Sequence, residues 1–542
     1  MQYLYVDPSD DVNKPIPSAF KTVTAAIAAV TSYPFSILIR RGTILKEAVN
    51  ARLVNTASEM SFFDTYGDGP PPKWLSTSNS SGQLASWNAR RITVQNIHFM
   101  DRDDGFTSAA AASVNLQCTG GADGVADVHV KKCYFTGNAY SVSNPNKNTI
   151  GRHVQLLAIA YDNAATPAHK LSVEDCMFNM VNAGVYIRGN TYAADTTDNR
   201  GDGSRTYGAK VLRCSFTNVV QEGALIHTCA SKNDVYTDDE WQSCVRDCYY
   251  SSYRWDKFTT AGASTYDAPF WMWHCNRVMF ENLEVHGSYP MAPDNMAVDI
   301  DGMCWDNVVR YVYSTGCART VMFVSADNAG LQASPPAGMS NFEFYYTRRQ
   351  GSGNNVVEYC FAFNDGIQRL QGQVGTQTND ACSISHHRNQ FNNTVRNCVF
   401  IDTSSVKQRR LISTNGYDTE SASVPSLTVE NCIFYCKWMT GSDIIAQLST
   451  GTRTIAPASQ IILNNNIIWS DAWSAAPNLS ALVTLSSNIW AKPQYALLPP
   501  SPPSTRRGAI NLGIPTNAKG IGRTNLLPDI TGRSGNNIGW LQ

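Results

Sequence analysis

The segment Thr394–Phe400, TVRNCVF, recurs through the chain and constrains its fold more than any other feature. Copies that keep the cysteine are VHVKKCYF (128–135), LSVEDCMF (171–178), KVLRCSF (210–216), CVRDCYY (244–250), NVVEYCFA (355–362) and LTVENCIF (427–434). Looser copies are ITVQNIHF (92–99), VMFENLEV (278–285), NVVRYVYS (307–314) and IILNNNII (461–468). A short β-strand that returns in this way predicts a solenoid, which grows by adding coils rather than domains.

Second short apolar strands follow many copies, for example AGVYIRG (183–189), GALIHT (223–228) and RTVMFVS (319–325). Asn or Gly commonly stands between the two strands, where a tight bend is needed. Two strands, a corner and a return segment make one coil of a parallel β-helix. The return segments differ in length and are polar, and such insertions usually gather on one face of a solenoid. We therefore expect an all-β, single-stranded parallel β-helix with long loops on one face.

Three regions are expected along the 542 residues. Residues 1–90 are expected to form an N-terminal cap and lead-in, with a short capping helix predicted by apolar residues at helical spacing in SAFKTVTAAIAAV (18–30). Residues 91–495 are expected to form the β-helix. Residues 496–542 begin with a Pro-rich connector and are expected to end in a C-terminal cap.

The 15 cysteines do not follow a disulfide pattern. Seven of them occupy one column of the repeat, where a small apolar side chain would face the interior. These seven are predicted to be free core thiols: Cys133, Cys176, Cys214, Cys248, Cys360, Cys398 and Cys432. One or two disulfides among the remaining cysteines are left open.

Charge and hydropathy exclude several partners. The formal net charge is −1 and no basic stripe is present, so nucleic acid is not an expected partner. No apolar run reaches the length of a membrane span, and the N-terminus MQYLYVDPSD lacks the pattern of a signal peptide. We expect no membrane insertion and no classical N-terminal secretion signal.

The repeated VxxCxF coils resemble those of the right-handed parallel β-helix (pectate-lyase-like) superfamily, and within it bacteriophage tailspikes or polysaccharide depolymerases. The segment VDIDGMCWDNVVRYVYS (298–314) is similar to the acid-containing coil of several β-helix glycosidases. The resemblance implies a right-handed helix that binds bacterial surface polysaccharide. It also implies a virion location in a phage tail, host-cell attachment, a homotrimer, and other tail proteins as partners.

Asp299 and Asp301 are the strongest candidates for chemistry. They alternate with Val298 and Ile300, so both carboxylates are predicted to point outward from one strand, about 7 Å apart. Glycoside hydrolysis needs one carboxylic acid to protonate the leaving oxygen and one carboxylate to activate water. The alternative is a solvated aspartate pair beside a turn. Further acids near strand corners are Glu222 and Asp294 as catalytic candidates, with Asp327 and Asp365 behind them.

The candidates for substrate binding are aromatic and polar side chains, because flat aromatic faces suit sugar rings. They are Tyr253, Arg254, Trp255, Trp271, Trp273, His227 and Arg319. Aromatic packing beneath a loop or in a subunit interface is the alternative. The acidic run DVYTDDEW (234–241) is expected to be a solvated face with some chance of binding calcium, and His386-His387-Arg388 is expected to lie in a loop.

Three functions remain open at this level. The first is a glycoside hydrolase with no cofactor or metal. The second is a polysaccharide lyase, in which aspartates hold Ca²⁺ against a uronate and Arg254, Lys257 or Arg319 removes a proton. The third is a non-catalytic tail spike or adhesin.

Overall fold

The structure is a computed structural model with two compact units, each described by itself. The first is Met1–Ala194 with Asp202–Thr265, and the second is Asp195–Gly201 with Tyr266–Gln542. The residues that the structure describes are 1–9, 15–75, 77, 82–100, 112–121, 123–137, 152–158, 168–189, 206–219, 221–252, 268–287, 296–324, 338–340, 343–347, 349–365, 382–387, 389–403, 410–415, 424–437, 445–447, 461–477 and 483–494.

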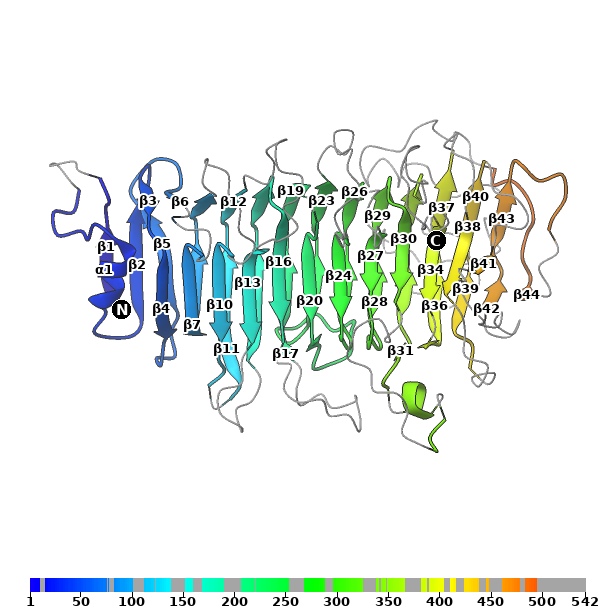
Figure 1. Cartoon of the computed structure of the whole chain (residues 1–542), viewed down its shortest axis with the longest axis horizontal. Helices are drawn as coiled ribbons and strands as arrows, with labels where there is room; N and C mark the ends of the chain where they lie inside the picture. The colour runs from blue at the N-terminus through cyan, green and yellow to red at the C-terminus, as the bar shows by residue number, and fades with distance from the viewer. Residues whose placement is uncertain are drawn as a thin grey trace. The chain divides into compact units, whose positions relative to one another are not determined.

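The first unit consists of coils that contribute one strand to each of three sheets, and all of the strand pairings described are parallel (Figure 1). Sheet A contains β1 (Gln2–Val6), β2 (Phe35–Arg40), β5 (Ser61–Tyr66), β8 (Ile92–Gln95), β11 (Val125–Lys131), β14 (His169–Glu174), β18 (Ala209–Leu212) and β22 (Cys244–Arg246). Sheet B contains β3 (Ile44–Lys46), β6 (Lys73–Leu75), β9 (His98–Met100), β12 (Tyr134–Thr136), β15 (Met177–Asn179), β19 (Ser215–Val219) and β23 (Tyr249–Ser252). Sheet C contains β4 (Val49–Val54), β7 (Leu84–Arg90), β10 (Val114–Cys118), β13 (Arg152–Ala158), β16 (Ala183–Arg188) and β20 (Ala224–His227). A two-stranded sheet pairs β17 (Thr206–Tyr207) with β21 (Cys229–Ala230).

The second unit repeats the same three-sheet plan. Its sheet A contains β25 (Met279–Glu281), β28 (Val308–Arg310), β32 (Val356–Glu358), β36 (Asn393–Arg396), β39 (Leu427–Glu430), β42 (Ile461–Asn464) and β44 (Thr484–Ser486). Its sheet B contains β26 (Glu284–His286), β29 (Tyr313–Thr315), β33 (Phe361–Phe363), β37 (Val399–Asp402), β40 (Ile433–Cys436) and β43 (Ile467–Ser470). Its sheet C contains β24 (Phe270–Trp273), β27 (Met296–Ile300), β30 (Arg319–Phe323), β34 (Cys382–His387), β38 (Arg410–Asn415) and β41 (Ile445–Gln447). A short π-helix, η4 (Glu343–Thr347), and the paired strands β31 (Ser352–Gly353) and β35 (Gln390–Phe391) complete it.

The repeated motif is two strands and not one. In TVRNCVF, β36 ends at Arg396, Asn397 takes a φ of 56°, and β37 of sheet B begins at Val399. This left-handed residue turns the chain from sheet A to sheet B, and Asn tolerates that conformation better than most residues. We expected the motif to form a single strand. The structure corrects this expectation, because the left-handed Asn397 divides the motif into β36 and β37. Val395, Cys398 and Phe400 are nevertheless all buried, because the extra residue at the corner restores their inward direction.

The cysteine column lies directly after this corner. All 14 cysteines whose side chains the structure describes are buried and free, which confirms the prediction for the seven repeat cysteines. Each thiol also serves the backbone: Cys398 Sγ accepts from the amide of Cys360 at 3.4 Å and lies 3.8 Å from the carbonyl of Val357 in the preceding coil. The column therefore bonds successive coils as well as filling the interior.

Aromatic rings stack along the interior side of sheet B in the first unit. Centroid separations run 5.6 Å from Trp74 to Phe99, 5.2 Å to Phe135, 4.7 Å to Phe178 and 4.9 Å to Phe216. The four phenylalanines come from the last motif position in successive coils, and Trp74 lies in register with Phe99. Parallel register brings identical positions together, so a repeated Phe becomes a continuous stack.

The N-terminal helix is shorter than the apolar spacing suggested. Helix α1 (Val23–Ala28) begins after Thr22, whose side chain accepts a hydrogen bond from the amide of Ala25 at 3.1 Å. The Glu47 carboxylate accepts from the amide of Val23 at 2.6 Å and so helps to hold the helix start. The helix contacts β1, β2 and β4, where it covers the first strands of the stack (Figure 1).

These features confirm the predicted parallel β-helix with a short capping helix. The right-handed sense follows the general rule for parallel crossovers. The division at residues 90 and 495 stays a prediction, although β1 to β7 already belong to the three sheets. Most of the predicted long loops lie outside the described residues. Among the helices that the structure describes, none is long and apolar enough to cross a membrane.

Candidate functional site

The outward face of sheet C in the second unit carries the aspartate pair. Val298 and Ile300 in β27 are buried in the interior, and Asp299 alternates with them on the opposite face. Asp299 lies in register between Trp271 of β24 and Met322 of β30. It is only 3% exposed. Within the strands of sheet C in both units, Asp299 is the only acidic residue that the structure describes.

Asp301 follows β27 directly and is held by two donors. The indole Nε1 of Trp271 donates to Oδ2 at 3.1 Å, and the amide of Gly302 donates to Oδ1 at 2.6 Å. Both carboxylate oxygens therefore accept hydrogen bonds, as suits an ionised carboxylate. Trp271 links the pair, because it neighbours Asp299 in register and donates to Asp301.

Two tryptophans form an aromatic surface beside the carboxylates. Trp271 and Trp273 are two residues apart in β24, and their rings stack at 6.2 Å with an interplanar angle of 16°. Both are partly exposed. Trp271 also packs against the buried Met296, Met322 and Val324. The predicted aromatic residues of this segment are therefore placed where a sugar ring could lie flat beside the aspartate pair.

The other predicted site residues lie in the first unit, elsewhere in the second unit, or outside the described residues, and their roles stay predictions. Glu222 and His227 belong to the first unit and are each 4% exposed. His227 Nδ1 lies 2.9 Å from the hydroxyl of Tyr186, and the two rings stack at 6.1 Å. The candidates that lie outside the described residues are Asp294, Tyr253, Arg254 and Trp255, with Lys257 and Asp327.

Arg319 lies at the start of β30 and is 4% exposed. It pairs in register with Met296 and shares the alternation of the buried Val321 and Phe323. Its burial leaves little of the guanidinium for a substrate or for proton abstraction from a uronate. Its role in substrate binding stays a prediction.

The hydrogen-bond partners of Asp365 indicate a structural role. Its carboxylate accepts from the hydroxyls of Ser314 and Thr320, the latter at 3.1 Å, and from the amide of Cys317 at 2.9 Å. It is 3% exposed, so these donors replace its hydration. The residue holds the corner between sheets B and C.

The acidic run 234–241 is fastened to sheet A of the first unit. Glu240 pairs with Lys170 at 2.8 Å, and Asp238 pairs with Arg246 at 3.0 Å. The Trp241 ring lies under the Lys170 ammonium at 4.5 Å. The run is therefore paired with strand cations, although Glu240 and Asp238 remain largely exposed. Among the described residues, no group of three or more His, Cys, Asp or Glu could hold a metal ion.

The histidine pair was expected in a loop, and this prediction is wrong. His386 and His387 lie in β34, where His386 faces the interior with no exposed surface beside Phe323. Burial lowers the pKa of His386 to about 3. Ser385 continues the outward column of Asp299 and Met322. Alternation in CSISHH was the signal that could have placed Ser385 and His387 on this face.

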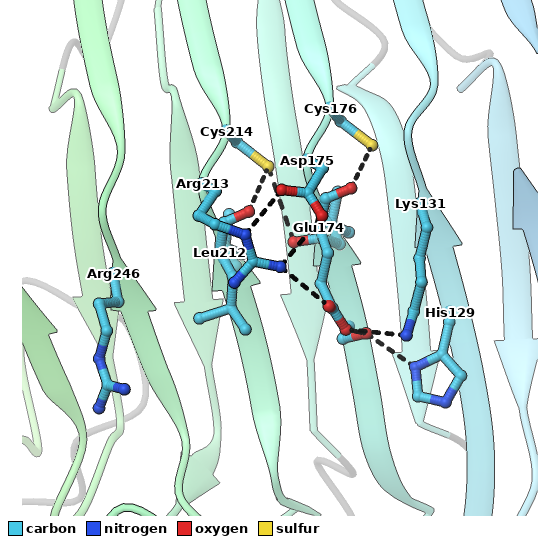
Figure 2. A network of polar contacts seen from close by, with 12 residues as sticks. His129, Lys131, Glu174, Asp175, Cys176, Leu212, Arg213, Cys214 and Arg246 are labelled. Carbon is cyan, nitrogen blue, oxygen red and sulfur yellow. Dashed lines mark hydrogen bonds and ion pairs between the residues drawn. The ribbon is translucent and has the colours of Figure 1, made fainter. Parts of the chain in front are cut away.

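A second polar cluster lies on sheet A of the first unit (Figure 2). Ser172 donates to Glu174 at 2.7 Å and lies 2.7 Å from Nδ1 of His129, while Lys131 pairs with Glu174 at 3.3 Å. Arg213 spans Glu174 and Asp175 at 3.3 and 2.6 Å. The cluster contains the residue types of a serine hydrolase, but the serine stands between the histidine and the carboxylate and is 3% exposed. A nucleophilic serine would donate to the histidine instead, so the cluster is structural.

The fold and this face define a parallel β-helix protein with a carboxylate pair beside two tryptophans on sheet C. No protein-family model matches the chain, and no curated protein sequence matches it. Solved structures do resemble it. The GH136 lacto-N-biosidase from Eubacterium ramulus has a TM-score of 0.48 and 15% identity, and the match covers 77% of this chain and 67% of the biosidase.

Two further solved structures also resemble the chain. The catalytic domain of a GH87 alpha-1,3-glucanase, in complex with tetrasaccharides, has a TM-score of 0.42 and 9% identity over 84% of this chain and 65% of the glucanase. The tailspike protein of E. coli bacteriophage HK620, in complex with a pentasaccharide, has a TM-score of 0.40 and 12% identity over 90% of this chain and 78% of the tailspike. Likeness at this level carries no conclusion about activity or substrate, so these rest on the residues of this chain.

Proposed function

We propose that the chain is a glycoside hydrolase that cleaves a polysaccharide with Asp299 and Asp301. One observation carries the proposal: the single acidic residue in the described sheet C strands points outward beside a second carboxylate, and Trp271 is in register with the first and donates to the second. A carboxylate that serves only as a solvated turn residue would not be buried between Trp271 and Met322. Burial of a carboxyl group costs free energy, so it requires compensating interactions or a functional use.

The surroundings assign different roles to the two groups. Asp299 is 3% exposed and lies in register between Trp271 and Met322, and burial disfavours the charged form of a carboxyl group. It suits the general acid that protonates the leaving oxygen. Asp301 accepts from Trp271 and from the amide of Gly302, which favours its ionised form. It suits the base that activates water.

Strand geometry leads to a stereochemical prediction. Side chains two residues apart on a strand are separated by about 7 Å. Retaining glycosidases hold their carboxyl groups about 5–5.5 Å apart, and inverting enzymes hold them about 6.5–9.5 Å apart to admit a water molecule. We expect inversion, which NMR of the first-formed anomer would detect. Retention of the substrate's anomeric configuration would contradict the assigned roles.

We further propose a bacterial surface polysaccharide as substrate, with the protein acting in host attachment as part of a phage tail. The resemblance of the repeated coils to tailspikes supports this finer proposal. A homotrimer and other tail proteins as partners belong to the same proposal. Release of oligosaccharides from purified capsule, exopolysaccharide and O-antigen preparations would identify the substrate, and sedimentation would give the oligomeric state.

The products separate hydrolysis from its two alternatives. Hydrolysis generates new reducing ends without the ultraviolet absorbance of an unsaturated uronide. A lyase generates both, and chelation of Ca²⁺ would abolish its activity. A non-catalytic spike binds the glycan and releases no oligosaccharide. We expect the first result, unchanged by chelator, and either of the other two would overturn the proposed reaction.

A further inference from the structure

The outward face of sheet B differs between the two units. In the first unit it consists of the two columns in register that begin at Ile44 and Lys46 of β3 and end in β23. Apolar, polar and basic side chains alternate along these columns, and none of them is buried. Tyr134 and Met177, which are neighbours on this face, are 42% and 51% exposed. The face is therefore in contact with solvent.

In the second unit the same face is apolar and buried. One outward column, in which every residue is at most 2% exposed, consists of Tyr313, Phe361, Val399, Ile433 and Ile467. The neighbouring column begins at Thr315 and continues with aromatic and aliphatic residues to the partly exposed Trp469. No outward position of β29, β33, β37, β40 or β43 carries a charge. The two columns form one hydrophobic cluster on the outside of the solenoid.

The direction of these side chains follows from strand alternation. Phe400 and Phe434 point into the solenoid, where their rings stack at 4.8 Å, so Val399 and Ile401 lie on the opposite face of β37. A contiguous apolar patch on the outside of a protein normally marks a surface that is covered by something else. The low exposure of this cluster is found in a single chain, so other residues of the same chain cover it.

The described chain reaches this face at its last strand. Ile489 packs against the cluster and forms a parallel bridge with Ile467. Lys492 Nζ lies 5.2 Å from the ring centroid of Tyr435 and pairs with Asp471 at 2.9 Å. The hydroxyl of Tyr435 donates to the same carboxylate at 2.7 Å. These contacts hold residues 489–492 beside the cluster, immediately before the C-terminal segment 495–542.

The sequence of residues 495–542 suits an apolar face. Short apolar stretches, YALLPP (495–500), AINLGI (509–514), NLLPDI (525–530) and IGWL (538–541), alternate with polar and glycine-containing ones. The segment also belongs to the second unit. The cluster extends over five strands, which at about 4.8 Å per strand is about 19 Å, and about six extended residues span that distance. The segment is therefore long enough and apolar enough to cover the whole cluster.

We infer that the outward face of sheet B in the second unit is the docking surface of the C-terminal segment 495–542 of the same chain. The apolar stretches of the segment cover Phe361, Val399 and Ile433 and remove them from water. This placement along the side of the solenoid differs from the cap across its end that the sequence suggested. The proposed homotrimer then forms through another face. The inference is independent of the proposed reaction.

A photo-crosslinking probe identifies the segment that covers the face. p-Benzoylphenylalanine is introduced into the full chain in place of Phe363, which lies on the face. The matched control carries the same probe in place of Tyr134, which lies outward on sheet B of the first unit. After irradiation and digestion, mass spectrometry identifies the crosslinked peptides. We expect the probe at position 363 to crosslink within one chain to residues 495–542, and the control to form no crosslink with that segment.

Folding of both probe variants is checked by circular dichroism and Tm. If position 363 does not tolerate the probe, Trp469 takes it instead, because this residue is partly exposed on the same face. A crosslink from the face to another part of the chain would overturn the inference. A crosslink between two copies would make the face a subunit interface and would overturn it as well. So would the lack of any crosslink from both positions.

Cleavage of the connector measures how tightly the segment is held. A specific protease site is placed within the Pro-rich connector of the full chain, and the cut protein is analysed by size-exclusion chromatography. We expect the segment to co-elute with the solenoid. Ile401→Ser should weaken its retention at least about tenfold on dilution, because a buried apolar contact is lost. Met177→Ser, on the first unit's face, should leave retention unchanged. Free elution of the cut segment, or equal effects of the two variants, would contradict docking at this face.

Discussion

Cys432 in the cysteine column has the same hydrogen-bonding function as Asn466, which occupies the same position one coil later. Cys432 Sγ accepts from the amide of Cys398 at 3.4 Å and lies 3.6 Å from the carbonyl of Val395. One coil later, Asn466 accepts from the amide of Cys432 at 2.8 Å and donates to the carbonyl of Val429 at 2.9 Å. Thiol and amide therefore satisfy the same two backbone groups.

This equivalence makes a prediction for Cys432. Cys432→Ala leaves a buried amide and a buried carbonyl without their partner, which typically costs about 1–3 kcal/mol. Cys432→Asn replaces both bonds and should be at least about 1 kcal/mol more stable than the alanine variant. Denaturant unfolding measures both. If the alanine variant equals or exceeds the asparagine variant in stability, the thiols act by packing alone.

The network of Figure 2 predicts an acid sensitivity. Burial lowers the pKa of His129 to about 4. Burial alone would raise the pKa of Glu174, but the hydrogen bond from Ser172 and the ion pair with Lys131 outweigh it and lower that pKa. Between the ordinary histidine pKa of about 6.5 and 4, the unfolded chain binds more protons at residue 129 than the folded chain does, so stability falls as pH falls.

His129→Gln should therefore flatten part of this pH dependence. The loss of Tm between pH 7 and 4.5 should be about 1–2 °C smaller than in the unaltered protein. Glu174 contributes at lower pH, since its stabilisation is lost as pH falls through its depressed pKa. Differential scanning calorimetry across this range provides the measurement. An unchanged slope in the variant would show that His129 does not contribute.

At the scale of the strand and corner, one backbone conformation recurs more regularly along the repeat than any side-chain type does. The residue before the cysteine column adopts a φ between 52° and 62° in coil after coil. These residues are Asn96, Lys132, Asp175, Arg213, Asp247, Asn282, Tyr311, Tyr359, Asn397, Asn431 and Asn465. Asparagine and aspartate dominate because they tolerate the left-handed conformation.

Lys132 departs from this preference and offers a stabilising substitution. Its φ is 52° and its side chain is exposed, so Lys132→Asn should raise the free energy of unfolding by up to about 1 kcal/mol. Lys131→Asn is the matched control, since Lys131 is extended in β11 and pairs with Glu174 at 3.3 Å. We expect no stabilisation from the control. Equal effects at both positions would contradict the role of the corner.

The sequence predicted burial in the repeat better than it predicted the repeat's division into strands. Val395, Cys398 and Phe400 could be recognised as core residues because they recur together. The corner at Asn397 could not be located, because an extra residue in a left-handed conformation breaks simple alternation without any change in composition. His386 and His387 were misassigned for a related reason, since CSISHH is too polar to be recognised as a strand from apolar content.

At the scale of the whole molecule, grouping the strands into sheets distinguishes candidate catalytic residues from residues with a structural role. Asp299 and Asp301 could be proposed from alternation. The structure adds their tryptophan neighbour and places no other carboxylate in the sheet C strands that it describes. The structural role of Asp365 could not be predicted, because only the fold brings Ser314, Cys317 and Thr320 around it.

The central claim is that two outward carboxylates on sheet C cleave a glycosidic bond. The most direct measurement compares release of reducing ends from the identified polysaccharide by the unaltered protein and by Asp299→Asn, Asp301→Asn and Ser385→Ala. Ser385 lies on the same outward column and serves as the control. Loss of either catalytic carboxylate should reduce kcat at least about 100-fold, with little change in glycan binding or Tm, because general acid or base catalysis contributes about that much. The serine variant should retain nearly full activity. Full activity in both aspartate variants would contradict the claim.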